Sequence, residues 1–194
     1  MKRILMTILL LTSMAPVFAQ KPIHMHVGGG LAFGDWANIT DDWEESWGMG
    51  YQGRLLINND ESRFAITPSY IFFPMNEFSF TESYFNTSTS VTVKPAMHYM
   101  NVEASFSAVK SNTLDLYLHL GPSFLLYSET VTASNNYYEG SGTNNEFKTG
   151  VIGGAGVRLN LGSRFGVFAD AGYSYISDDW DQLLITGGVM VRVF

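Results

Sequence analysis

The sequence predicts an all-β fold, an eight-stranded antiparallel up-and-down transmembrane β-barrel. Three observations support this prediction. Apolar residues recur at every second position in eight segments, which is the period of a β-strand with two different faces. The connections between these segments alternate between short and long. No run of eighteen apolar residues follows residue 19, so the chain offers strands and no helix for crossing a membrane.

The predicted strands are long enough to cross a bilayer. A tilted transmembrane strand needs about 9–11 residues, and most of the segments reach that length. In chain order the predicted strands are residues 23–34, 48–57, 63–73, 96–108, 114–127, 147–159, 164–176 and 183–194.

The connections between the predicted strands sort by length. Those after the second, fourth and sixth strands are short and rich in turn formers, with the sequences NNDES, VKSNT and NLGS. The others are polar and mostly long, and they cover residues 35–47, 74–95, 128–146 and 177–182. An even number of strands, with short turns at one end and long loops at the other, is typical of outer-membrane barrels.

The two faces of the strands predict which side meets lipid. In the seventh strand Phe165, Val167 and Ala169 share one face, while Gly166 and Asp170 share the other. Glycine is expected where space is short, and an eight-stranded barrel has just enough interior for side chains. We therefore predict that the aliphatic rows face lipid and that glycines and charges face the lumen. The alternative is a secreted lipocalin-like barrel with an apolar cavity.

The N-terminus predicts export. Lys2 and Arg3 precede the short apolar run 4–11, and small residues at 17–19 suit a signal peptidase, so residues 1–19 are predicted to be a signal peptide and 20–194 one barrel domain. Removing the signal peptide leaves nine bases against eighteen acids, a formal charge of −9. This balance argues against nucleic acid as a partner. The chain has no Cys, so no disulfide supports the fold.

The chain resembles the small outer-membrane β-barrel proteins of Gram-negative bacteria, such as OmpX and the membrane domain of OmpA. The resemblance rests on the signal peptide and on the stretches HVGGGLAFGDW (26–36), GVIGGAGVRLNLGSRFGVFADAGYSY (150–175) and GGVMVRVF (187–194). It implies a monomer with both termini in the periplasm, long extracellular loops, lipid and lipopolysaccharide as surroundings, and insertion by the barrel assembly machinery. One departure is that Phe194 shares its face with Arg192 rather than with the apolar row.

Six charged residues are predicted to face the lumen. Because unpaired charges in a narrow interior are costly, we expect them to form a salt-bridge network that plugs the barrel, with Arg54 bridging Glu103 or Asp170. The alternative is that each charge separately meets water in the lumen. The predicted network comprises Arg54, Glu103, Asp115, Arg158, Asp170 and Arg192.

The histidines do not predict a catalytic or metal site. His24, His26 and His119 are expected on the lumen side, where two of them belong to the frayed start of the first strand, so no metal or other cofactor is predicted. His98 points outward, as in barrel enzymes that trim acyl chains from lipid A. The nucleophile those enzymes place two residues later is missing, since Met100 stands there. The chain is therefore predicted not to be an enzyme.

Aromatic residues are predicted to form a girdle at the level of the lipid headgroups. The predicted girdle comprises Trp36, Trp47, Phe72, Tyr99, Tyr127, Tyr175 and Trp180. The four connections beyond this girdle carry thirteen of the eighteen acids and the single base Lys94.

The predicted function is that of a non-enzymatic outer-membrane barrel with acidic, aromatic-rich loops, acting in surface interaction or envelope integrity. The first alternative is a lipid-A-modifying barrel enzyme, either an acyl hydrolase or an acyl transferase. A small-solute channel is less favoured, because eight strands leave little room for a pore.

Overall fold

The computed structural model describes residues 23–35, 47–59, 61–84, 87–135, 137–176 and 180–193, without the side chains of Trp47, Tyr84 and Thr87. The predicted signal peptide and Phe194 lie outside the described residues. No helix in the described ranges is long and apolar enough to cross a membrane.

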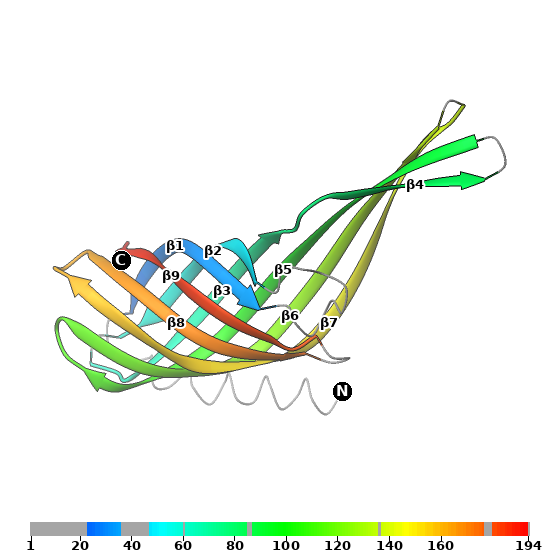
Figure 1. The fold of residues 1–194 in the computed structure, drawn as a ribbon. Helices are drawn as coiled ribbons and strands as arrows, with labels where there is room; N and C mark the ends of the chain where they lie inside the picture. The colour runs from blue at the N-terminus through cyan, green and yellow to red at the C-terminus, as the bar shows by residue number, and fades with distance from the viewer. Residues whose placement is uncertain are drawn as a thin grey trace.

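Nine strands are present in the described residues, and eight of them close a ring (Figure 1). Every pairing is antiparallel, and the order β3-β2-β1-β9-β8-β7-β6-β5 is closed by pairing of β3 with β5. The predicted eight-stranded antiparallel barrel is therefore confirmed. The strands are β1 (His24–Asp35), β2 (Trp47–Asn58), β3 (Phe64–Pro74), β4 (Phe78–Tyr84), β5 (Thr87–Lys110), β6 (Leu114–Ser134), β7 (Glu139–Leu161), β8 (Phe165–Ile176) and β9 (Gln182–Arg192).

Two of the predicted long loops are wrong, because residues 74–95 and 128–146 are largely strand. The β6–β7 register runs unbroken from Leu114 opposite Leu159 to Ser134 opposite Glu139. β4 adds to the far end of β5, so β4 to β7 form a four-stranded sheet that projects beyond the ring (Figure 1). We call the segments 78–95 and 128–147 the projecting sheet. Their Ser and Thr content suggested loops, yet these residues alternate with Val, Ala and Phe at the period of a strand.

The barrel has two unlike ends. At the turn end, short connections join β2 to β3, β5 to β6 and β7 to β8, and the projecting sheet stands at the opposite end, the sheet end (Figure 1). The tight β7–β8 turn uses Gly162 with φ of 93°, a conformation that strains other residues. Lys110 Nζ ties two turns together by donating a hydrogen bond to the carbonyl oxygen of Asn59 at 3.1 Å.

The wall of the ring separates an apolar outer face from an inner face. Leu118, Leu120 and Val189 are each about 60% exposed on the outside, whereas Glu103 and Asp170 are buried on the inside. The faces are those predicted from the alternation.

Candidate functional site

The lumen near the turn end contains buried ion pairs. Arg54 Nη1 lies 2.6 Å from Asp170 Oδ2, and both side chains are almost fully buried. The Tyr117 hydroxyl donates to the other oxygen of the Asp170 carboxylate, and Thr186 Oγ1 donates to Oδ2 at 3.4 Å. A Cβ at Gly156 would overlap Asp170 Oδ1, so this close approach requires glycine. The carboxylate is thus compensated by one cation and two hydroxyl groups.

A second pair lies beside the first. Arg158 Nη1 donates to Asp115 Oδ2 at 3.0 Å, and its Nη2 donates to Ser105 Oγ at 3.3 Å. The Arg158 guanidinium lies 3.9 Å from the centroid of the Tyr117 ring, and Tyr117 in turn bonds Asp170. Tyr117 therefore links the two pairs. Sequence reasoning missed this role, although Tyr117 shares its face with Asp115.

The remaining predicted charges have other partners. Glu103 contacts the ring of His119 and accepts a hydrogen bond from Ser69 Oγ at 3.4 Å. Arg192, at the turn end, contacts His24, with its Nη2 2.7 Å from His24 Nε2. The structure thus places Arg54 against Asp170 and Arg158 against Asp115, while Glu103 takes a histidine partner.

Phe168 supports the first pair. Its large ring lies on the lumen face of β8, where most of the other residues are small. The Arg54 guanidinium lies 4.0 Å above the centroid of that ring. Cations are attracted to the face of an aromatic ring, so Phe168 provides a favourable surface for a buried guanidinium.

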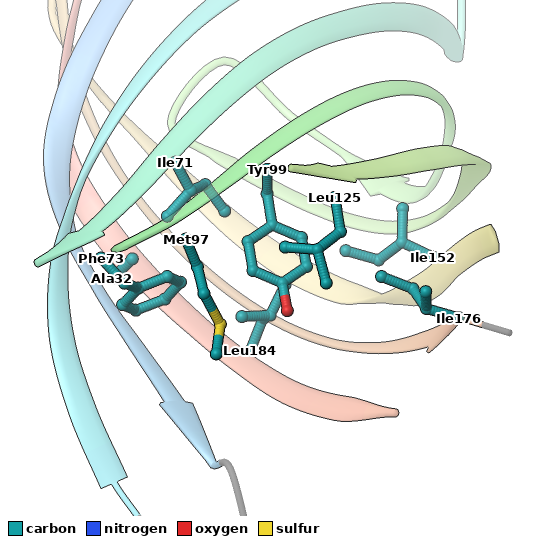
Figure 2. Close-up of a cluster of buried hydrophobic side chains, with 9 residues drawn as sticks. All are labelled: Ala32, Ile71, Phe73, Met97, Tyr99, Leu125, Ile152, Ile176 and Leu184. Carbon is teal, nitrogen blue, oxygen red and sulfur yellow. The ribbon is translucent and has the colours of Figure 1, made fainter. Parts of the chain in front are cut away.

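An apolar cluster, which the sequence reasoning missed, fills the lumen near the sheet end. Its side chains come from seven strands of the ring and meet on the barrel axis (Figure 2). Tyr99, Phe73 and Met97 are fully buried there. The cluster comprises Ala32, Ile71, Phe73, Met97, Tyr99, Leu125, Ile152, Ile176 and Leu184. We call it the apolar seal.

The space between the ion pairs and the apolar seal is small. It amounts to about 10 Å³ and is lined by Arg54, Glu103, His119, Ile71 and Leu184, among others. Such a space holds about one water molecule. In the described residues, therefore, side chains occupy the lumen from the ion pairs to the sheet end. A cavity of about 270 Å³, lined by Asp115, Arg158 and Arg192 among others, remains at the turn-end mouth.

The predicted aromatic girdle is partly wrong. Tyr99 is 0% exposed and packs edge-on against Phe73 in the lumen, at 6.0 Å between centroids. The ring centroids of Tyr127 and Trp180 lie 5.3 Å apart, and both side chains pack against the apolar seal. The reason is parity, because Tyr99 shares its face with Asn101 and therefore points inward.

Other aromatic residues do lie on the outer wall. Phe72 is half-buried there, and Tyr175 is 62% exposed. Trp36 and the side chain of Trp47 lie outside the described residues. Tyr51, Tyr70, Phe147 and Tyr173 also expose their rings on the outer face toward the sheet end.

His98 stands on the outer wall beside Tyr70. Its Nδ1 lies 2.6 Å from the Tyr70 hydroxyl oxygen. The described residues that line the groove around it include no serine, threonine or carboxylate. For the described part of the chain there is likewise no group of three His, Asp or Glu side chains placed to hold a metal ion.

The projecting sheet has two chemically different faces. On one face Phe78 and Phe80 of β4 lie opposite Val93 and Val91 of β5, and this face continues the lumen side of the ring. On the other face hydroxyl groups pair across strands, with Ser79 Oγ 2.9 Å from Thr92 Oγ1 and Thr130 Oγ1 3.3 Å from Thr143 Oγ1. This hydroxyl face continues the outer wall of the ring.

Carboxylates outnumber bases in the described residues of the sheet end. Lys94 pairs with Glu77 at 2.8 Å, and Lys148 pairs with Glu146 at 3.1 Å. Further acids there are Asp35, Glu82, Glu129, Glu139 and Asp181. The densest predicted acidic loop, 35–47, lies mainly outside the described residues.

Comparison with known proteins agrees with this architecture. A family model described as an outer membrane protein beta-barrel domain matches residues 5–192. No curated protein sequence is detectably similar.

Solved structures of low sequence identity share the fold. Ail, the attachment invasion locus protein of Yersinia pestis, is 16% identical over 88% of this chain and 97% of its own, with a TM-score of 0.54. The N-terminal β-barrel domain of Pseudomonas aeruginosa OprF is 13% identical over 89% and 98%, with a TM-score of 0.50. A major outer membrane protein from Thermus thermophilus is 10% identical over 88% and 99%, with a TM-score of 0.64.

Proposed function

Because the chain belongs to the family of outer-membrane protein β-barrel domains, we propose that it is a non-enzymatic surface-interaction protein whose projecting sheet binds an extended segment of a partner protein. The observation that carries the proposal is the projecting sheet itself, which ends in β4 and exposes apolar side chains on one face. The filled lumen supports this proposal over a solute channel.

The proposal includes an orientation. We place the sheet end outside the cell and the turn end, with both termini, in the periplasm, because short turns face the periplasm in bacterial barrels and longer connections face outward. Residues 1–19 then serve as the signal peptide, and the barrel assembly machinery inserts a monomer among lipid and lipopolysaccharide. The acidic sheet end is consistent with this placement.

The edge of the projecting sheet is suited to strand pairing. β4 pairs with β5 on one side, and no described strand pairs with its other side. An open edge presents backbone N–H and C=O groups that an extended peptide can pair with, and side-chain pockets add specificity. Phe78 and Phe80 are each more than 40% exposed beside this edge, so they offer apolar contacts to alternate residues of the peptide.

The charge of the sheet end selects the chemistry of the partner. The described acids there outnumber the bases, and Lys94 and Lys148 are already paired with carboxylates. We therefore propose a partner segment that alternates apolar and basic residues. Ail of Yersinia pestis has been solved in complex with the heparin analogue sucrose octasulfate. For this chain we expect no binding of that polyanion, because like charges repel.

The test is a binding experiment with the intact barrel in phospholipid nanodiscs, screened against a displayed library of extended peptides. We expect enrichment of alternating apolar and basic sequences. Phe80→Asp should weaken the binding of enriched peptides by about tenfold or more, because it removes an apolar contact and places a carboxylate against the apolar residues of the peptide. Ser79→Asp, on the opposite face of the same strand, is the matched control and should bind as the native barrel does.

Two results would contradict the proposal. One is equal loss of binding in the Phe80→Asp and Ser79→Asp barrels, which would show that the apolar face of the projecting sheet does not make the contact. The other is a preference for acidic peptides or for sucrose octasulfate.

A further inference from the structure

A shallow, open groove of about 470 Å³ lies on the outer wall across β2, β3 and β5. Its lining residues are Tyr51, Gln52, Gly53, Tyr70, Phe72 and His98. We propose that this groove is a binding site for one phosphorylated membrane lipid, with an acyl chain lying over Gly53 and the headgroup beside His98.

The floor of the groove at Gly53 has no side chain, and neither has its partner Gly29. Gly53 pairs with Gly29 on β1 and with Tyr70 on β3. The next outward rows on either side are filled by the pairs Val27–Leu55 and Leu31–Tyr51. A Cβ added at Gly53 would meet no atom within 4 Å. Gly53 and Gly29 therefore leave a short gap, bounded by Tyr70 and Val189 in their own row and by large side chains in the rows on either side, into which part of an acyl chain fits.

A polar pair marks one side of the groove. The Tyr70 hydroxyl oxygen lies 2.6 Å from His98 Nδ1, and the Phe72 ring packs on the imidazole at 5.0 Å between centroids. If the phenol donates to Nδ1, Nε2–H remains as a donor, and if Nδ1–H donates to the phenol oxygen, the phenol O–H remains. The pair thus retains a donor in every protonation state. A phosphate or ester oxygen of a lipid is the acceptor available at a membrane surface.

The height of the Tyr70–His98 pair on the outer wall corresponds to the level of the lipid headgroups. On β6, Leu118 and Leu120 face outward below it, and Leu126 lies directly opposite His98. The next outward position is Ser128, from which the hydroxyl face of the projecting sheet begins. Adjacent outward positions are about 7 Å apart along a strand. His98 therefore stands one step below the point where the wall becomes polar, the interfacial level at which amphipathic side chains gather.

The occupant follows from this placement. The groove opens on the surface that faces the bilayer, so membrane lipid is the molecule in contact with it. The site depends on membrane insertion alone and does not require a protein partner for the projecting sheet. The choice of lipid A as a probe uses the proposed outward orientation of the sheet end.

The test is native mass spectrometry of the purified, folded barrel in detergent micelles, titrated with lipid A and with dephosphorylated lipid A. We expect saturable binding of one lipid A. Gly53→Leu should fill the groove and weaken binding about tenfold. The control is Gly187→Leu, another outward glycine whose added Cβ meets only the Phe168 carbonyl oxygen at 3.5 Å, and it should bind normally. His98→Phe should reduce the preference for the phosphorylated lipid while retaining the apolar contact.

Equal affinity of the native, Gly53→Leu and Gly187→Leu barrels would overturn the proposal, since lipid would then coat the wall without a site. An unchanged phosphate preference in His98→Phe would overturn the assignment of the headgroup. Because the measurement uses micelles and no peptide, its failure is distinguishable from failure of peptide binding to the projecting sheet.

Discussion

At the scale of the residue, the Asp170 carboxylate shows how the lumen accommodates charge. It is buried among strands and is compensated by Arg54, by the Tyr117 hydroxyl and by Thr186. Removing a carboxylate from water costs several kcal/mol, and a close cation with further donors offsets that cost. The pair therefore stabilises the barrel only as long as both members remain.

Replacing Arg54 with Met should destabilise the barrel by about 3–5 kcal/mol, because an uncompensated carboxylate would stay buried. Urea unfolding in lipid micelles, followed by the shift of the folded band on unheated gels, measures this change. The double variant Arg54→Met with Asp170→Asn should recover much of the loss. Arg164→Met, at an exposed position in the β7–β8 turn, should lie within about 0.5 kcal/mol of the native barrel. A loss at Arg164 equal to that at Arg54 would contradict the assignment.

At the scale of the element, β5 and β6 change the polarity of their faces along their length. Inside the ring, outward positions such as Met100 and Leu118 are apolar, and inward positions such as Glu103 are charged. In the projecting sheet the same outward parity carries Thr92 and Thr130, while the inward parity carries valines. A strand that leaves lipid for water needs a polar outer face, and its inner face then packs only against its neighbours and the seal.

Val93→Asp should loosen the projecting sheet without unfolding the ring. Val93 is 4% exposed on the apolar face, so a carboxylate there would be buried without a partner. We expect backbone hydrogen exchange over residues 87–95 and 128–134 to accelerate about tenfold or more, equivalent to about 1.4 kcal/mol. Thr92→Asp on the hydroxyl face is the control and should exchange at the native rate. Equal acceleration within the ring would show that the projecting sheet and the ring unfold together.

At the scale of the whole molecule, the barrel is filled in two layers. The ion pairs lie in the half near the turn end, together with the buried side chains of Leu56, Ala65, Phe168 and Met190. The apolar seal, whose side chains Figure 2 shows, occupies the half near the sheet end. An eight-stranded ring is narrow enough for side chains to fill it. The seal offers an ion few polar groups besides the Tyr99 hydroxyl, so the second layer opposes conduction more strongly than the first.

The native barrel should therefore show no steady conductance in planar bilayers. Met97→Ala together with Tyr99→Ala should open the seal and produce conducting events, at a cost of about 2–5 kcal/mol for each large side chain removed. Met100→Ala with Val102→Ala, on the outer face of the same strand, is the control and should remain closed. A large, steady conductance in the native barrel would contradict the closed lumen.

The alternation of apolar residues was sufficient to predict the ring and its faces, since in a closed sheet each position can point only inward or outward. The girdle prediction is wrong for Tyr99. The clustering of aromatic residues places Tyr99 on the outer wall, whereas its odd-numbered position on β5 directs its side chain into the lumen. The projecting sheet was missed for a related reason. Its Ser and Thr residues give it the composition of a loop, which masks the alternation with Val and Ala before residue 96 and after residue 127.

The sequence by itself thus determined an eight-stranded barrel with aliphatic residues outside and charges inside, because these properties follow from the period and composition of single strands. Only the tertiary structure decided that Arg54 meets Asp170, that Glu103 meets His119, and that Gly53 and Gly29 share one row. These contacts depend on the stagger between strands and on distances across the lumen. The sequence of a single strand specifies neither the stagger nor these distances, so the contacts are determined only when the ring closes.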